Sequence, residues 1–254
     1  MKAVVLLSAG RHPVSGKPVL PRLEAQAIAL AAGIKGQTSG LHAGAGTTGV
    51  ADALGHGLER IDWLAIAADA DPVPALAAHL RDVRPDLIFA GRRGQGGEDT
   101  GLLPYALADA LGLPILADVV ASGPANEPGA MRFDQALPKG AKRRVTMRLP
   151  ALVTMHPLAP APMPYAFARA RRGVLCRKDG VSIVPPPTSF EERPHRARPK
   201  LMRRAGAASE DGAGVIVDPG PEEAARLILD HLEKLGIRRF SRHAAETEWE
   251  PPPS

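Results

Sequence analysis

Short apolar runs alternate with helix-forming segments over the first 120 residues, and this alternation most limits how the chain can fold. The strand-like runs occupy residues 3–8, 62–68, 86–90 and 114–120, with a weaker one at 35–43. Segments of helical composition occupy residues 22–32, 74–83 and 102–111, and a short glycine-interrupted helix is expected within 43–59. Strands separated by helices of this length are typical of βαβ units. We therefore expect an α/β fold with a doubly wound, mostly parallel sheet.

The pattern changes between residues 122 and 154. Short runs with polar breaks replace the alternation there, at residues 131–135, 143–149 and 151–155. Such runs are typical of hairpin strands rather than of βαβ units. We expect all three as antiparallel strands added at one edge of the sheet.

The region from residue 157 to residue 204 is dense in proline and arginine and has hardly any apolar periodicity. This composition argues against a second hydrophobic core. Order returns in residues 214–236, where a small strand precedes a helix with Glu222 and Glu223 in its first turn. We predict one α/β domain over residues 1–184 and an extended C-terminal arm over 185–254, with a helix at about 221–235.

Composition excludes several classes of protein. The single cysteine excludes an internal disulfide framework and a multi-cysteine metal site, and it is typical of a reducing compartment such as the cytoplasm. We expect no membrane insertion, because no run approaches 18 uncharged apolar residues. Arginine-rich clusters at 142–144, 169–172 and 193–204 contain few aromatic residues, so we expect them to contact acidic proteins or solvent rather than nucleic acid.

A glycine-rich loop at residues 91–101, GRRGQGGEDTG, lies between a predicted strand and a predicted helix. Open α/β sheets bind ligands at this place, beyond the carboxyl ends of their strands. Glycines allow the backbone to approach a phosphate, and the Thr100 hydroxyl is available as a donor. The alternative is a turn without ligand, in which Glu98 and Asp99 cap the helix. The loop is neither a Walker A motif nor a strict Rossmann fingerprint.

The loop over residues 8–18 follows the first predicted strand and is expected to reach the same crevice. Its charged residues Arg11, His12 and Lys17 either face an anionic ligand or face water. We find no arrangement typical of a catalytic nucleophile, because Cys176 falls in a predicted basic loop without a nearby histidine. We therefore expect a protein without catalytic residues of its own.

Several stretches, taken in order, resemble the beta subunit of electron transfer flavoprotein, a heterodimeric carrier of electrons from flavin dehydrogenases. These stretches are residues 86–114, 149–157, 162–173 and 214–236, so the resemblance extends over most of the chain. The chain departs from the family in a compressed segment after the first strand and in a shorter nucleotide loop. The compressed start resembles a branch associated with demethylation of N-methylated amines.

The resemblance implies an α/β crevice that holds a structural AMP, or a second FAD as in bifurcating relatives. The implied binding residues are Ser8, Ala9, Gly10, Arg11, Ala68, Asp69, Gly91, Gly97, Glu98, Asp99, Thr100 and Gly101. The redox FAD is shared and is held mainly by the alpha subunit. A recognition loop at about 156–173 is implied to dock partners through Met163, Pro164, Arg169, Arg171 and Arg172. The alternative for Met163 is that it packs locally.

The function implied is that of a carrier subunit paired with an alpha subunit. It would accept electrons from a flavin-dependent dehydrogenase or demethylase and pass them toward electron transfer flavoprotein–quinone oxidoreductase. A stand-alone nucleotide-binding regulator of the universal-stress type is the alternative, and the long basic arm argues against it. An adenylating enzyme is a further alternative, but its Ser-Gly-Gly-Xaa-Ser type of loop is missing from this sequence.

Overall fold

The computed structural model describes residues 1–12, 14–93, 100–184 and 219–236. The chain divides into two compact units, Met1–Phe190 and Glu191–Ser254. None of the helices in the described ranges is long and apolar enough to cross a membrane.

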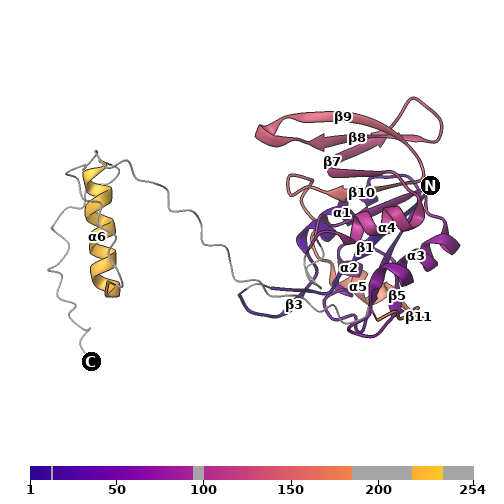
Figure 1. The fold of residues 1–254 in the computed structure, drawn as a ribbon, viewed down its shortest axis with the longest axis horizontal. Coiled ribbons are helices and arrows are strands. Elements are labelled where there is room, and N and C mark those ends of the chain that lie inside the picture. Colours follow the sequence, from indigo (N-terminus) through magenta and orange to yellow (C-terminus); the bar gives the residue numbers. More distant parts are fainter. Residues whose placement is uncertain (13, 94–99, 185–218, 237–254) are drawn as a thin grey trace, which may run out of the picture. The chain divides into compact units, whose positions relative to one another are not determined.

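A nine-stranded sheet forms the centre of the first unit (Figure 1). Its strands, in spatial order, are β11 (Val174–Asp179), β5 (Arg60–Ala65), β4 (Gln37–Gly44), β1 (Lys2–Leu7), β6 (Leu87–Ala90), β10 (Ala151–Met155), β7 (Ile115–Pro124), β8 (Ala130–Ala136) and β9 (Lys142–Arg148). Every neighbouring pair from β11 to β7 is parallel, and β7–β8 and β8–β9 are antiparallel. The expected fold class is therefore confirmed.

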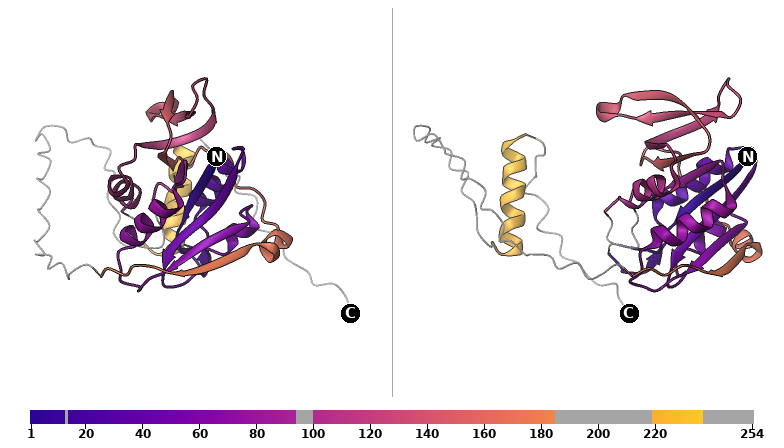
Figure 2. Two further views of the ribbon diagram at one scale, coloured as in Figure 1. Left: turned by 90° about the vertical axis from the view of Figure 1, so that its right-hand side faces the viewer. Right: turned by 45° about the vertical axis from the view of Figure 1, so that its right-hand side comes forward.

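Helices cover both faces of this sheet, as the two views in Figure 2 show. The helices are α1 (Arg22–Ala32), α2 (Asp52–Gly55), α3 (Pro72–Val83), α4 (Leu103–Leu111) and the short α5 (Phe167–Arg172). Apolar residues of α1 and α2 pack with Val5 and Phe89 in one core. Residues of α3 and α4 pack with Val4 and Ile88 in a second core on the opposite face. Successive strand residues therefore serve different cores, as expected for strands that are buried on both faces.

Local signals place most helix ends where the sequence predicts them. Helix α1 ends before Gly33, and α4 ends before Gly112, whose φ of 65° lies in the left-handed region that glycine adopts readily. Helix α3 begins at Pro72, two residues before the predicted start. The reason is a capping bond, because the Asp71 carboxylate accepts a hydrogen bond from the Val73 amide at 2.9 Å.

The prediction for residues 151–155 is wrong in its position and its direction. This run is β10, which pairs in parallel with β6 on one side and β7 on the other. All five of its residues are buried. A continuous apolar run is typical of a strand that is covered on both faces, whereas a half-exposed edge strand alternates. The other two runs are β8 and β9, and they are antiparallel as predicted.

Two elements in the proline- and arginine-rich region were not predicted. Helix α5 and strand β11 lie between residues 167 and 179, so Cys176 belongs to a strand and not to a loop. Most residues of both elements are exposed or only partly buried, which explains the missing apolar period. β11 forms because it pairs with β5 over six residues, from Val174 opposite Arg60 to Asp179 opposite Ala65.

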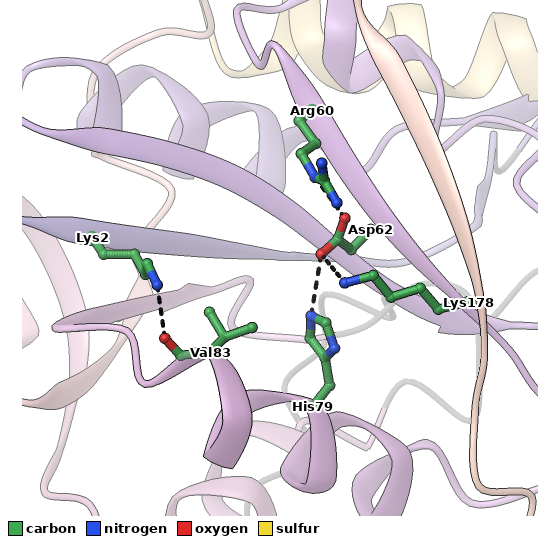
Figure 3. Close-up of polar contacts among 6 residues, drawn as sticks. All are labelled: Lys2, Arg60, Asp62, His79, Val83 and Lys178. Atoms are coloured by element: carbon green, nitrogen blue, oxygen red, sulfur yellow. Dashed lines mark hydrogen bonds and ion pairs between the residues drawn. The ribbon is translucent and has the colours of Figure 1, made fainter.

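A carboxylate on β5 ties β11 to the sheet (Figure 3). Asp62 is 9% exposed and accepts hydrogen bonds from Arg60 Nε and Lys178 Nζ, both at 2.8 Å. His79 Nε2 of α3 lies 3.3 Å from the same carboxylate. Burial favours the protonated form of Asp62, but the bonds from Lys178 and Arg60 outweigh it and lower its pKa. Asp62 thus joins two strands and a helix through one buried charge.

In the second unit, the described residues form helix α6 (Pro221–Lys234). Glu222 and Glu223 lie in its first turn, so this part of the prediction is confirmed. The small strand predicted before this helix, and most of the predicted arm, lie outside the described residues.

Candidate functional site

A cavity of about 890 Å³ lies at the carboxyl ends of β1, β4 and β6. These strands meet where the winding of the sheet reverses, because the chain runs from β1 outward to β4 and β5 and then returns to β6 on the other side of β1. Ligands of open α/β sheets bind at this type of switch point. The volume also falls within the usual range for small-molecule sites.

Nine of the residues proposed to bind a nucleotide line this one cavity. They are Ser8, Ala9, Gly10, Arg11, Ala68, Asp69, Gly91, Thr100 and Gly101. They come from three loops that are far apart in sequence, and the fold brings these loops together. Gly97, Glu98 and Asp99 lie outside the described residues.

His12 and Lys17 are not among the described residues that line the cavity. Both are exposed in the hairpin formed by β2 (Gly10–Arg11) and β3 (Pro18–Val19). His12 Nδ1 accepts a hydrogen bond from the Ser15 amide at 3.2 Å, which closes the turn. Of the three charged residues considered in this loop, only Arg11 reaches the cavity.

Sequence reasoning missed a second set of lining residues, which includes Glu24, His42, the segment 43–46 and Thr48. The sequence AGAG at 43–46 spans the carboxyl end of β4, so the same rule about strand ends could have identified it. Glu24 and His42 carry no comparable signal, because a polar residue inside a helix or strand is usually solvated. Their burial depends on how α1 and β4 pack.

Glu24 of α1 is a buried acid at the edge of the cavity. It is 2% exposed, and its Oε2 accepts a hydrogen bond from the Ser8 amide at 2.7 Å. Its Oε1 is hydrogen-bonded to the Ser8 hydroxyl. Burial raises the pKa of Glu24 to about 8, even though the two bonds to Ser8 act in the opposite direction. Glu24 is therefore mostly protonated at neutral pH.

His42 of β4 connects two of the loops that line the cavity. It is 4% exposed, and its Nδ1 lies 2.9 Å from the carbonyl oxygen of Leu7. Its Nε2 lies 2.9 Å from the carbonyl oxygen of Gly46. Gly44 leaves room for the ring, because a Cβ at this position would lie 2.7 Å from Nε2. The ring thus fixes the AGAG turn against the end of β1.

Thr100 closes the turn before α4. Its Oγ1 accepts a hydrogen bond from the Leu102 amide at 3.2 Å, and its own proton remains free to donate. Gly101 follows with a φ of 75°, which lies in the left-handed region. Capping by Glu98 and Asp99 stays a prediction, since both residues lie outside the described part.

Small residues and backbone atoms form most of the cavity wall. Its charged residues include two arginines, Arg11 and Arg93, and two aspartates, Asp69 and Asp71. Such a wall lets peptide amides and carbonyls contact a ligand directly. In the described ranges, no group of three or more His, Cys, Asp or Glu side chains has a metal-binding arrangement. The cavity therefore suits a polar organic ligand that is recognised largely by backbone.

The recognition loop packs onto the end of α2. The Ala166 amide donates to the Gly55 carbonyl at 3.0 Å, and His56 Nδ1 lies 2.8 Å from the Met163 carbonyl oxygen. The Tyr165 ring lies so close to Gly55 that a Cβ there would collide with it. These contacts give the loop a defined conformation.

The five residues proposed to dock partners differ in their exposure. Met163 is partly buried. It packs against the core that contains residues of α1 and α2, and its methyl group lies against Gly57. Pro164, Arg169, Arg171 and Arg172 are exposed. Phe167 is 67% exposed, and the Arg171 guanidinium lies 5.8 Å from the centre of its ring. Of the three arginines, Arg171 lies against the Phe167 ring, and all three belong to α5, whereas Met163 packs toward the core.

Similarity to known proteins extends over most of the chain. A family model described as "Electron transfer flavoprotein domain" matches residues 15–175. The electron transfer flavoprotein subunit beta of Chromohalobacter salexigens is 34% identical over 258 residues, which cover 94% of this chain and 96% of that protein. The match includes most of the described cavity and the recognition loop. The chain therefore belongs to the electron transfer flavoprotein family, on the beta-subunit side.

Proposed function

We propose that this chain is the beta subunit of a heterodimeric carrier in the cytoplasm that accepts electrons from a flavin-dependent dehydrogenase or demethylase. The acceptor is electron transfer flavoprotein–quinone oxidoreductase. The observation that carries the proposal is the cavity at the switch point of the sheet, in a chain of this family. An electron-transfer role with a flavin and an alpha subunit follows from the family. The identities of the electron donors and of the acceptor are what we propose beyond it.

The cavity residues fit an adenine nucleotide. Glycines at positions 10, 44, 46, 91 and 101 leave the backbone accessible, and Ser8, Thr100 and Arg11 are positioned as donors. We propose AMP as a structural ligand here, with a second FAD as the alternative. The redox FAD is held mainly by the alpha subunit, and it supplies the one- and two-electron chemistry. The residues of this chain then bind, orient and exclude water around the nucleotide.

Co-expression with the alpha subunit tests this function. We expect a stable heterodimer that releases one FAD and one AMP, identified by absorbance and mass spectrometry after denaturation. Two FAD per heterodimer would assign the cavity to FAD instead. A nucleotide-bound chain that stays monomeric beside the alpha subunit would contradict the carrier and support the stand-alone regulator.

We propose that partners dock on the exposed face of the recognition loop. Arg169, Arg171 and Arg172 would attract an acidic surface, and the exposed Phe167 ring beside Arg171 offers an apolar contact. A small charged interface of this kind suits rapid association and release, which a carrier requires. In this proposal Met163 holds the loop in place by packing against the core and Gly57.

Replacing Phe167 and Met163 by alanine separates docking from packing. Phe167→Ala should raise the KM for the partner dehydrogenase about fivefold to thirtyfold, while stability changes by less than about 0.5 kcal/mol. Met163→Ala should cost about 1–2 kcal/mol of stability, because a partly buried side chain leaves a smaller cavity than a fully buried one. Steady-state reduction assays and urea unfolding measure the two effects. Unchanged kinetics in Phe167→Ala would exclude this docking surface.

The C-terminal arm is proposed to pack on the alpha subunit. Helix α6 leaves Leu227, Ile228 and Leu229 between 38% and 60% exposed, and these side chains would gain burial in a heterodimer. Limited proteolysis tests this proposal. We expect cleavage between residues 185 and 236 in the isolated chain and protection in the heterodimer. Equal protection in both samples would contradict the proposed contact.

A further inference from the structure

Both carboxyl oxygens of Glu24 are hydrogen-bonded to one residue, Ser8, at the end of β1. The Ser8 amide donates to Oε2 at 2.7 Å, and the Ser8 hydroxyl is bonded to Oε1. Ser8 and Glu24 both line the cavity, next to Gly91. A Cβ on Gly91 would lie 3.3 Å from Glu24 Cγ, so the glycine brings the loop after β6 directly against this pair. The pair is therefore part of the wall that a ligand contacts.

The proton on Glu24 decides what the Ser8 hydroxyl can do. An ionised carboxylate only accepts hydrogen bonds, so the Ser8 hydroxyl must direct its hydrogen toward Glu24. The oxygen of Ser8 then presents only lone pairs to the cavity. A protonated Glu24 can donate from Oε1 to the Ser8 oxygen, which frees the hydrogen of Ser8 for another acceptor. Protonation of Glu24 thus converts Ser8 from an acceptor into a donor toward the cavity.

The surroundings of the pair keep the carboxyl group of Glu24 mostly protonated at neutral pH. Burial raises the pKa of Glu24 to about 8. Among the described residues of the cavity, the other charged or titratable groups are Arg11 on β2, His42 on β4, Asp69 and Asp71 after β5, and Arg93 after β6. Within the described part of the chain, no ion pair involves Glu24, and the hydrogen bonds of its carboxyl group go to Ser8. The carboxyl therefore titrates in the range where a carrier works.

We propose that Ser8 and Glu24 form a proton-dependent anion-binding pair, in which protonated Glu24 lets the Ser8 hydroxyl donate to an anionic oxygen of the nucleotide. This inference rests on the proposed nucleotide function of the cavity. It assigns the recognised group by its chemistry, which is a phosphate oxygen that accepts a hydrogen bond. An ionised Glu24 weakens binding in two ways, since the donor is lost and a negative charge faces the ligand.

AMP titrations at several pH values test the pair. The full-length chain is purified with its alpha subunit, stripped of AMP and titrated calorimetrically with AMP between pH 7 and pH 9. Across this range the phosphate is almost fully ionised, because its second pKa is about 6. Since the protonated fraction of Glu24 is the competent fraction, we expect Kd to rise about tenfold between pH 7 and pH 9. Adenosine, which lacks the phosphate, should show no such rise.

Three variants distinguish the pair from its surroundings. Glu24→Gln, whose amide donates to Ser8 at every pH, should bind AMP at pH 9 about tenfold more tightly than the unmodified chain. Ser8→Ala should bind weakly and with a much smaller pH dependence, because only the charge of Glu24 still varies with pH. Asp109→Asn removes an exposed carboxylate of α4 and should keep the full pH dependence.

The outcomes separate this inference from the proposed function. AMP binding with the same Kd at pH 7 and pH 9 would overturn the pair and leave the nucleotide site standing. Wild-type pH dependence in Ser8→Ala, or the same dependence for adenosine, would also overturn it. No AMP binding at any pH would overturn the pair together with the proposed AMP site.

Discussion

Glu24→Gln is expected to raise the free energy of unfolding by about 3 kcal/mol at pH 7. The pKa of Glu24 is near its ordinary value of 4.5 in the unfolded chain and is raised to about 8 in the fold. Between these values the folded state holds a proton that the unfolded state has released. Stability is therefore complete below pH 4.5 and falls by about 1.4 kcal/mol per pH unit up to about pH 8. Glutamine has no proton to lose, so the variant avoids this fall.

Urea unfolding at pH 5, 7 and 8 measures the effect. The unmodified chain should lose stability steadily over this range, whereas Glu24→Gln should change much less. Asp109→Asn is the matched control, because it neutralises an exposed carboxylate and should follow the unmodified chain. A Glu24→Gln variant no more stable than the unmodified chain at pH 7 would show that the buried carboxyl ionises without cost. The pKa of Glu24 would then lie close to its ordinary value in the fold.

Asp62→Asn should lower the free energy of unfolding by about 2–3 kcal/mol at pH 7. Removing one partner of a buried ion pair typically costs about 3–5 kcal/mol, and the half-exposed Arg60 and Lys178 reduce this figure because water screens them. His79 contributes as a neutral hydrogen-bond donor, since burial and Lys178 lower its pKa despite the nearby carboxylate. The loss should appear first in β11, which Lys178 anchors.

A second aspartate provides the control for this prediction. Asp134 accepts a hydrogen bond from Arg144 Nε at 2.8 Å, the same distance as between Asp62 and Arg60, but the Arg144 side chain is 65% exposed. Asp134→Asn should therefore leave stability close to that of the unmodified chain. Urea unfolding and amide exchange of β11 compare the two variants. Equal stabilities and equal exchange rates would mean that the Asp62 cluster does not hold the strand.

The two buried acids affect stability in different pH ranges. The pKa of Asp62 is lowered in the fold, so its stabilisation is present above the unfolded pKa and is lost as pH falls through the folded value. Glu24 acts in the opposite direction, because its stabilisation is lost as pH rises toward 8. Asp62→Asn should flatten only the acid limb of the stability profile, and Glu24→Gln only the decline between about pH 4.5 and about pH 8. The difference arises from their partners, since Asp62 contacts cations and Glu24 contacts a neutral serine.

Much of the fold and part of the site could be predicted from particular residues. The apolar run before Ala9, the helix that stops at Gly33 and the helix that stops at Gly112 are local signals, and the structure confirms each of them. The rule that ligands bind at strand ends predicted that the loops after β1 and β6 share one cavity, and the family resemblance added Ala68 and Asp69 after β5. The membership of the family also follows from the order of motifs along the chain.

Other features depended on contacts between distant residues. Residues 151–155 read as a hairpin strand in sequence, yet β10 inserts between β6 and β7. Strand β11 has no apolar period of its own and forms because β5 and Asp62 hold it. Met163 matched an apolar anchor by resemblance, with local packing as the alternative, and the structure shows that its methyl group packs against Gly57.

The sequence by itself determined the type and ends of most elements, the winding of the sheet and the glycine-rich loops at strand ends. Hydrophobic period, caps and turn residues act within a few residues, so they can be recognised locally. Only the tertiary structure decided the order of the strands, the burial of Glu24 beside Ser8 and the anchoring of β11 by Asp62. These depend on which surfaces meet after folding, and burial is what turns an ordinary glutamate into an acid that keeps its proton near neutral pH.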